Sequence, residues 1–321
     1  MRKLILKNHQ SPGDVVMLTA AVRDLHLSQP NRFITDVNTS CPHLWENNPY
    51  ITKLSLDDSD IELIDCRYPL IHKANTIPYH FVHAFRMFLE ERLGVKIEAS
   101  FFKGDIYISD IEKSWYSQVQ EMGIEKPFWI INAGGKFDFS CKWIDPKTMQ
   151  EVVDYFEGKI VFVQCGSPEH WHKPLKGVVD LIGKTDLRQL VRLMYHSSGV
   201  LCPVTCYMHL AAAIETRPGM PKNRPCVVVA GGREPTHWEA YPHHRYLSMV
   251  GALDCCDNGG CWKSRCQLMN DNDSKDKKEN LCIYPVQVSD ELRIAKCMDM
   301  IKPHHIIDAI ESYYKGGALK Y

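Results

Sequence analysis

The sequence lacks an excess of charge of either sign. Its 321 residues include 38 Lys and Arg against 39 Asp and Glu, which gives a formal net charge of −1. A chain this close to neutral has no bulk electrostatic attraction to nucleic acid or to an anionic membrane. We therefore expect any polyanionic ligand to be held by a local site, and we find no strong sign of a nucleic-acid partner.

Long apolar runs are also missing. No segment approaches the ~18 uninterrupted apolar residues of a membrane-spanning helix. The apolar run at the N-terminus is broken at once by Lys7, Asn8 and Pro12, which argues against a signal peptide. With 45% apolar and 24% charged residues, the composition is that of an ordinary globular protein. We expect a cytoplasmic protein with no transmembrane segment, in a compartment where thiols stay reduced.

Cysteine, by contrast, is abundant and unevenly distributed. Six of the thirteen cysteines lie between residues 255 and 297. In a reducing compartment such clustering indicates metal or redox chemistry rather than disulfides. Four thiolates from short turns match a tetrahedral site for Zn²⁺ or Fe, although the spacing is not the repeated C-x2-C of a zinc ribbon. Free buried thiols are the alternative. The predicted ligands of this structural metal are Cys256, Cys261, Cys282 and Cys297, with Cys255 or Cys266 as substitutes.

Strand and helix patterns alternate along the chain. Short apolar runs predict strands at 4–6, 33–37, 128–131, 160–163, 199–202 and 226–230. Periodic segments predict helices at 14–25, 110–122, 145–157, 186–197 and 205–216. This alternation predicts an α/β protein with doubly wound parallel sheets. We expect the segment 110–122 to link two domains, at 1–125 and 126–321, with a ligand cleft between them at the carboxyl ends of the strands.

Three strand-ending loops of the second half indicate a phosphorylated ligand. Glycine pairs at 134–135 and 231–232 follow two strands, and residues 205–209 open a helix after a third. Glycine allows the backbone to approach a ligand closely, and a helix N-terminus presents free N–H groups to an anion. Lys142 adds a point charge suited to phosphate. Each loop alone is ordinary turn chemistry. Together they predict a phosphorylated or nucleotide ligand.

Five elements occur in a fixed order between the first strand and about residue 245. They are Ser11-Pro-Gly-Asp14, Ala133-Gly-Gly135 with Lys142-Trp143, Gly183-Lys-Thr-Asp-Leu-Arg-Gln-Leu190, Val204-Thr-Cys-Tyr-Met-His-Leu-Ala-Ala212, and Val229-Ala-Gly-Gly-Arg233 with Trp238-Glu-Ala-Tyr241. In this order they resemble the motifs of glycosyltransferase family 9, the group of the lipopolysaccharide heptosyltransferases. The resemblance implies a GT-B fold, in which two Rossmann-like domains face a central cleft. It also implies inverting transfer of a sugar, such as heptose from ADP-heptose, from a nucleotide-diphospho-sugar to the hydroxyl of a glycan, lipid-linked or protein acceptor.

The resemblance also implies roles for individual residues. Asp14 is expected to be the catalytic base that takes the acceptor proton, although an acid at this position also suits a helix cap. Lys142 and the helix start at 205–209 are expected to hold the diphosphate, and Glu169 the ribose hydroxyls. A solvated lysine and a satisfied helix histidine are the alternatives for Lys142 and His209. No paired-acid motif of the Asp-x-Asp type stands out, so we expect no catalytic divalent metal. The complete set of predicted donor-binding residues is Gly134, Gly135, Lys142, Glu169, Thr185, Thr205 and His209.

Two positions depart from the family pattern. Val204 and Cys206 stand where the family carries Asp and Gly, and the missing carboxylate usually helps to hold the donor. This departure leaves a catalytically silent sugar-nucleotide-binding or assembly protein as the alternative function, and a homo-oligomer is also open. The cysteine cluster lies beyond the last matched element, in a C-terminal appendage at about 254–298. There it is similar to the cysteine-bound iron finger of bacterial autotransporter heptosyltransferases.

Overall fold

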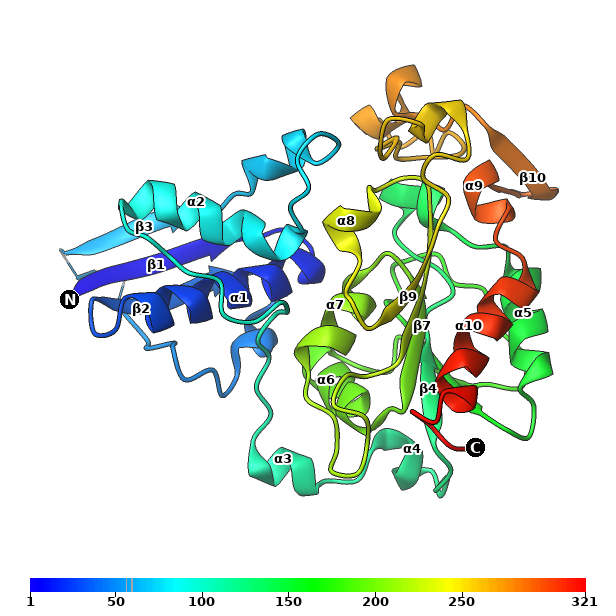
Figure 1. Ribbon diagram of the computed structural model, residues 1–321, viewed down its shortest axis with the longest axis horizontal. Helices are drawn as coiled ribbons and strands as arrows, with labels where there is room; N and C mark the ends of the chain where they lie inside the picture. The colour runs from blue at the N-terminus through cyan, green and yellow to red at the C-terminus, as the bar shows by residue number, and fades with distance from the viewer. Residues whose placement is uncertain (56, 59) are drawn as a thin grey trace.

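The strands of the described residues form two parallel sheets and a separate hairpin (Figure 1). The computed structural model describes residues 1–55, 57–58 and 60–321. The first sheet has three strands in the order β2–β1–β3, and the second has six in the order β6–β5–β4–β7–β8–β9. Every pairing within these two sheets is parallel. The predicted α/β class is therefore confirmed.

The first sheet forms around β1 (Arg2–Asn8), which pairs with β2 (Phe33–Thr39) and β3 (Ile61–Asp65). Helix α1 (Pro12–Ser28) joins β1 to β2 and packs against α2 (Ala84–Leu93). Proline suits the start of α1 because the first helical position needs no N–H donor. The middle of α1 is buried almost all round, so this helix lies deep in the first half of the molecule.

The second sheet has its first strand in the middle. The strands are β4 (Phe128–Ile131), β5 (Val161–Gly166), β6 (Val179–Ile182), β7 (Gly199–Pro203), β8 (Cys226–Gly231) and β9 (His244–Ser248). The helices are α5 (Pro146–Tyr155), α6 (Leu187–His196), α7 (Cys206–Ala213), α8 (Thr236–Glu239) and α10 (Pro303–Lys315). Three strands lie on each side of the boundary between β4 and β7, and their order along the chain proceeds outward from that boundary. This strand order is that of dinucleotide-binding folds. In such sheets the ligand lies at the carboxyl ends of the two strands where the order reverses, here β4 and β7.

The single helix predicted over 110–122 is wrong. The structure has two short helices there, α3 (Asp110–Ser114) and α4 (Gln118–Glu121). Ser109 and Ser117 each cap a separate helix, because the hydroxyl of each accepts a hydrogen bond from the backbone N–H three residues later. The second cap interrupts the first helix and turns the chain. None of the helices in the described ranges is long and apolar enough to cross a membrane.

The segment after β9 forms a cysteine-rich module, residues 249–299, beside the end of the second sheet (Figure 1, yellow to orange). It contains short 3-10 turns, the antiparallel pair β10 (Pro285–Ser289) and β11 (Leu292–Ala295), and α9 (Lys296–Asp299). Its loop is organised by Arg265, which is fully buried and donates hydrogen bonds to Asp271 (2.8 Å) and Asp276 (2.6 Å). Two aspartates of the charged loop at 270–280 therefore neutralise the charge of the buried Arg265 guanidinium.

The two halves meet along α1 and α7 and again at Asn75. Asn75, which follows β3, donates a hydrogen bond to the Gly260 carbonyl (2.9 Å). Its Oδ1 accepts hydrogen bonds from the Gly260 N–H (3.1 Å) and from Trp262 Nε1 (2.9 Å). The cysteine-rich module thus contacts the first half directly.

Candidate active site

The first turn of α1 lies against the start of α7. A Cβ at Gly13 would be 3.1 Å from His209 Cδ2 and 3.7 Å from Cys206 Cα, so only a glycine allows this close approach without displacement. Asp14 follows immediately, at the carboxyl end of β1. The packing therefore brings Asp14 to the same edge of the molecule as the helix start at 205–209.

The side chain of Asp14 is half-buried. It makes a hydrogen bond within its own helix turn, and it also feels the charge of Lys142 from the second half of the molecule. Its Oδ2 accepts a hydrogen bond from the Ser11 N–H (3.0 Å), so the carboxylate does cap its own helix. Burial raises the pKa of Asp14 above its usual value, and the Tyr68 hydroxyl, the Ser11 N–H and the charge of Lys142 oppose that rise. An aspartate with a raised pKa is a stronger base than a solvated one.

Lys142 connects the two sides of the β4–β7 boundary. It ends the 3-10 helix η4 (Phe137–Lys142), and its Nζ donates to the backbone carbonyl of Val204 (3.2 Å) at the end of β7. The same Nζ forms an ion pair with Glu234 Oε1 at 2.6 Å. Lys142 therefore lies at the crevice where the strand order predicts the ligand.

Glu234 places a buried carboxylate beside Lys142. Its side chain is 1% exposed and pairs with both Lys142 and Arg233. Burial opposes ionisation, but these two cations outweigh it and hold the pKa of Glu234 below its usual value. Val204 offers only its backbone carbonyl to Lys142, so Glu234, from the loop after β8, is the acid that orients this lysine. Sequence reasoning missed it, although the loop Gly231-Gly-Arg-Glu234 had been singled out for its glycines.

His209 is buried with a neighbour at each ring nitrogen. Its Nδ1 lies 2.9 Å from the Tyr241 hydroxyl, and its Nε2 lies 3.4 Å from Glu239 Oε2. Burial lowers the pKa of His209 well below its usual value. Burial, together with the charge of Glu234, raises the pKa of Glu239 to about 8. Near neutral pH the arrangement is therefore a neutral imidazole facing a protonated carboxyl group.

We expect the substitution Glu239→Gln to remove a pH dependence of stability. The folded state favours the neutral form of Glu239, so wild type loses stability as the pH rises from 4.5, its ordinary pKa, through about 8. Glutamine is neutral throughout this range and has nearly the same shape as glutamate. Thermal unfolding across this window should show the melting temperature of wild type falling relative to Glu239→Gln. The exposed Glu151→Gln is the control. Parallel curves for wild type and Glu239→Gln would contradict the assignment.

The glycine loop after β4 is closed by a neighbouring segment. Gly135 and Trp171 exchange two backbone hydrogen bonds of 3.0 Å. A Cβ at Gly134 would be 1.9 Å from the Trp171 carbonyl oxygen, so this glycine is needed for the contact. Trp143 stacks on Trp171 with ring centroids 4.4 Å apart. These hydrogen bonds and the stacked tryptophan rings therefore hold the loop that carries Lys142 in place.

The other predicted donor-binding residues lie along the same sheet edge. Thr205 is half-buried at the end of β7, and its Oγ1 donates to the Pro203 carbonyl (3.3 Å). Glu169 is exposed after β5, and Thr185 is half-buried after β6. Their strands β5 and β6 lie outward of β4 in the sheet, and the loop after β5 folds back so that Trp171 pairs with Gly135. The sequence did not single out a second lysine, Lys136, whose Nζ donates to Ser11 Oγ (2.7 Å) and so joins the second half to the first.

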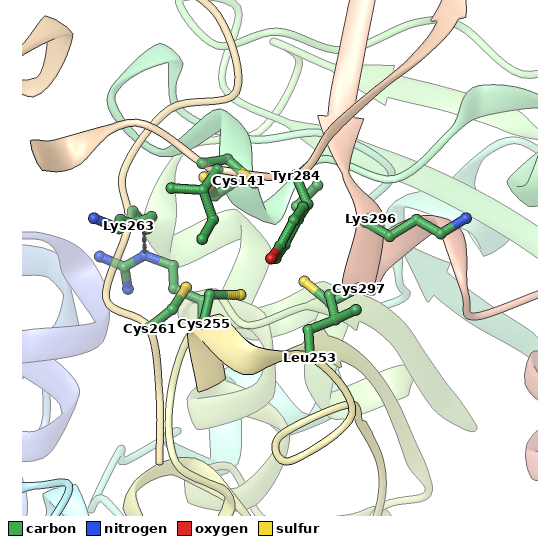
Figure 2. A pocket seen from close by; sticks show the side chains of 12 residues that line it. Cys141, Leu253, Cys255, Cys261, Lys263, Tyr284, Lys296 and Cys297 are labelled. Carbon is green, nitrogen blue, oxygen red and sulfur yellow. Dashed lines mark hydrogen bonds between the residues drawn. The ribbon is translucent and has the colours of Figure 1, made fainter. Parts of the chain in front are cut away.

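The cysteines that were predicted to bind metal do not all meet. Cys261, Cys282 and Cys297 line a pocket of about 10 Å³ together with Cys141 and Cys255 (Figure 2). Cys256 is buried apart from this lining set, with its Sγ 3.4 Å from the carbonyl oxygens of Met249 and Leu253. In the described part of the chain, three thiols have their sulfur atoms within 4.8 Å of one another. They are Cys141, Cys266 and Cys282.

These features define a class. Two parallel α/β sheets bring an aspartate from one side, and a lysine and a helix start from the other, to one edge at the strand ends; this is the architecture of GT-B glycosyltransferases. Residues 68–244 match the sequence model of glycosyltransferase family 9 (heptosyltransferase). This span is more than half of the 321 residues, so the chain belongs to glycosyltransferase family 9. The predicted enzyme class is confirmed.

Solved structures with the same fold span nearly the whole chain. A glycosyl transferase of family 9 from Veillonella parvula matches with a TM-score of 0.62 and 15% identity over 98% of both chains. The ADP-heptose lps heptosyltransferase II of E. coli matches with a TM-score of 0.61 and 14% identity over 99% of this chain and 100% of that chain. The dodecameric iron-containing heptosyltransferase TibC of enterotoxigenic E. coli, in complex with ADP-D-beta-D-heptose, matches with a TM-score of 0.62 and 14% identity over 98% of this chain and 76% of TibC. No curated protein sequence matches the chain. The predicted GT-B fold is confirmed.

Proposed function

We propose that this glycosyltransferase moves a heptosyl group from ADP-heptose to an acceptor hydroxyl with inversion at the anomeric carbon. The observation that carries the proposal is the position of Asp14 opposite the helix start at 205–209, beside the charge of Lys142. The similarity in fold to E. coli heptosyltransferase II and to TibC, which was solved with ADP-D-beta-D-heptose, supports heptose as the sugar.

The reaction needs one base and one site for a leaving anion. The Asp14 carboxylate accepts the proton of the acceptor hydroxyl, and the hydroxyl oxygen forms a bond to the anomeric carbon. The bond from that carbon to the diphosphate oxygen breaks on the opposite face, which inverts the configuration. The Lys142 ammonium and the N–H groups at the start of α7 stabilise the negative charge that the diphosphate acquires. No step in this scheme calls for a divalent cation.

The two halves divide the substrates between them in this proposal. Residues 1–125 form the acceptor-side domain and residues 126–321 the donor-binding domain. The acceptor is a glycan, a lipid-linked molecule or a protein. The ribose hydroxyls lie toward Glu169 and the diphosphate toward the β4–β7 boundary, as the strand order favours. The donor-binding set is Gly134, Gly135, Lys142, Glu169, Thr185, Thr205 and His209.

A cysteine-bound structural metal, Fe or Zn, belongs to the same proposal. The thirteen cysteines are free thiols, five of them around one small pocket, and thiolates are the ligands that both metals prefer. The iron content of TibC supports this assignment. So many free thiols also suit a reducing compartment, which supports a cytoplasmic location. TibC is dodecameric, and a homo-oligomer is part of the proposal for this chain as well.

The function is tested by screening nucleotide sugars for binding and turnover. We expect ADP-heptose to raise the melting temperature, because a ligand that binds only the folded state stabilises it. We also expect release of ADP to accelerate when acceptor is added. UDP- and GDP-linked sugars of similar size are the matched controls. Binding of ADP-heptose with no turnover on any class of acceptor would favour the catalytically silent alternative. No binding of any ADP-sugar would overturn the donor assignment.

A further inference from the structure

One member of the three-thiol group lies far from the others in sequence. Cys266 and Cys282 belong to the cysteine-rich module, but Cys141 belongs to η4, in the loop that follows β4. The Sγ atoms of Cys141 and Cys266 are 3.6 Å apart, and both side chains are almost fully buried. Three thiols therefore converge from separate segments of the chain, and none of them forms a disulfide.

The donor set and the space fit a tetrahedral metal ion. Zn–S bonds of about 2.3 Å place the sulfur atoms of a four-thiolate site about 3.8 Å apart. The three sulfur atoms lie within 4.8 Å of one another. Cys141 and Cys282 also line the pocket of about 10 Å³, which has room for about one water-sized sphere. Cys255, Cys261 and Cys297 line the same pocket and can supply a fourth thiolate, and Figure 2 shows them below Cys141 in this view.

Backbone hydrogen bonds hold these segments in register around the thiols. The Cys141 N–H donates to the Ser264 carbonyl (3.1 Å), and the Cys266 N–H donates to Ser140 Oγ (2.9 Å). The Cys282 N–H donates to the Arg265 carbonyl (2.7 Å). The η4 segment and the cysteine-rich module are therefore built as one unit, with the sulfur atoms on its inside.

The same unit contacts both partners of the Lys142–Glu234 ion pair. Lys142 directly follows Cys141 in η4. On the other side, the Trp262 N–H donates to the Arg233 carbonyl (3.0 Å), and Arg233 Nε donates to the Lys263 carbonyl (2.6 Å). Arg233 in turn pairs with Glu234. A change in the packing of the thiols is therefore expected to shift both Lys142 and Glu234. Lys142 is covalently bonded to Cys141, and Glu234 follows Arg233, which is hydrogen-bonded to the cysteine-rich module.

We propose that Cys141, Cys266 and Cys282 ligate a single thiophilic metal ion, Zn²⁺ or Fe, and that this ion positions Lys142 for the donor diphosphate. Cys141 is the one of these three ligands that lies outside the cysteine-rich module. Because Cys141 directly precedes Lys142, the metal would connect that module to the donor site. The first part of the proposal stands on the thiols alone. The second part rests on the proposed function, since it needs a nucleoside diphosphate bound at Lys142.

The full chain should be purified without chelator and its metal measured by elemental analysis and, after exchange, by the visible spectrum of bound Co²⁺. We expect about one equivalent of metal in wild type and the spectrum of tetrahedral cobalt–thiolate coordination. Cys141→Ala should lower bound metal at least twofold and change the cobalt spectrum. The control is Cys66→Ala, which removes a buried thiol in the first half of the molecule. A full equivalent of metal with an unchanged spectrum in Cys141→Ala would overturn the ligand assignment.

The link to the donor site is tested by titrating ADP into metal-loaded and metal-free wild type. We expect the Kd for ADP to rise about tenfold on metal removal and to recover when Zn²⁺ is restored. A second variant, Cys141→Asp, keeps a metal-binding side chain at this position and should retain more metal than Cys141→Ala. Equal ADP affinity with and without metal would overturn the link. Absence of ADP binding in both states would instead count against the proposed function and leave the metal-content result standing.

Discussion

Replacing Asp14 with asparagine should reduce kcat by about 10²–10⁴-fold, the usual contribution of a general base. Asparagine has nearly the same shape, and its carbonyl oxygen can still accept the hydrogen bond from the Ser11 N–H, so α1 keeps its cap. What the variant loses is the ability to take the acceptor proton. Initial rates of ADP release in the presence of acceptor, with calorimetric titration of ADP, separate this loss from weakened donor binding.

The control for Asp14→Asn is Asp154→Asn, which changes an exposed aspartate on α5. Donor affinity should be unchanged in both variants, and the rate should fall only in Asp14→Asn. A variant at position 14 that keeps a tenth or more of wild-type kcat would show that Asp14 only caps its helix. The base would then be another group near the carboxyl ends of β1, β4 and β7.

Asp14→Asn should also be more stable than wild type at neutral pH. Burial raises the folded-state pKa of Asp14, so the native state favours the protonated form. The stability that this protonation contributes is present below the unfolded-state pKa and is lost as the pH rises through the folded-state value. The advantage of the variant should therefore shrink as the pH is lowered. Thermal unfolding at several pH values checks the sign.

Replacing Lys142 with methionine should raise the Kd for ADP by about 10–100-fold, since a hydrogen bond to a charged group contributes about 1.5–3 kcal/mol. It should also destabilise the protein, because Glu234 is buried and would lose one of its two cationic partners. Lys147→Met, on the exposed surface of α5, is the matched control and should change neither quantity.

A double variant separates these two effects. Glu234→Gln removes the buried negative charge, so Lys142→Met with Glu234→Gln should recover part of the lost stability but none of the lost ADP affinity. Glu234→Gln alone should weaken ADP binding to a smaller extent, because Lys142 keeps its charge but loses its orienting partner. Recovery of ADP affinity in the double variant would contradict the assignment of Lys142 to the diphosphate.

Sequence patterns were sufficient to predict the central strands of the second sheet. The runs at 128–131, 199–202 and 226–230 are buried on both faces of a parallel sheet, and such strands are continuously apolar. Strands β3 and β6 were missed because their residues are mostly half-buried or exposed and give no apolar run. The helix predicted over 110–122 failed for a local reason, since the cap at Ser117 competes with continuation of the helix.

The residues of the candidate site that directly follow predicted strands could be predicted from the sequence. Lys142 and Thr205 lie in the loops after β4 and β7, which are neighbours in one parallel sheet, so the topology alone brings them to one edge. Asp14 follows β1 of the other sheet and reaches this edge through the packing of α1 against α7. Glu234 and Cys141 were not predictable in the same way. Their partners are distant in sequence, and the ion pair and the thiol contact arise only when the loops after β4, β7 and β8 pack against the cysteine-rich module.

Asn75 bears on how the two halves of the molecule are held together. Its three hydrogen bonds to Gly260 and Trp262 join the first half to the cysteine-rich module, and all three must break before the halves can separate at that edge. At about 1 kcal/mol net for each bond, they stabilise this contact by about 3 kcal/mol. One amide side chain outside the proposed chemistry therefore helps to fix the position of the cysteine-rich module relative to the first half.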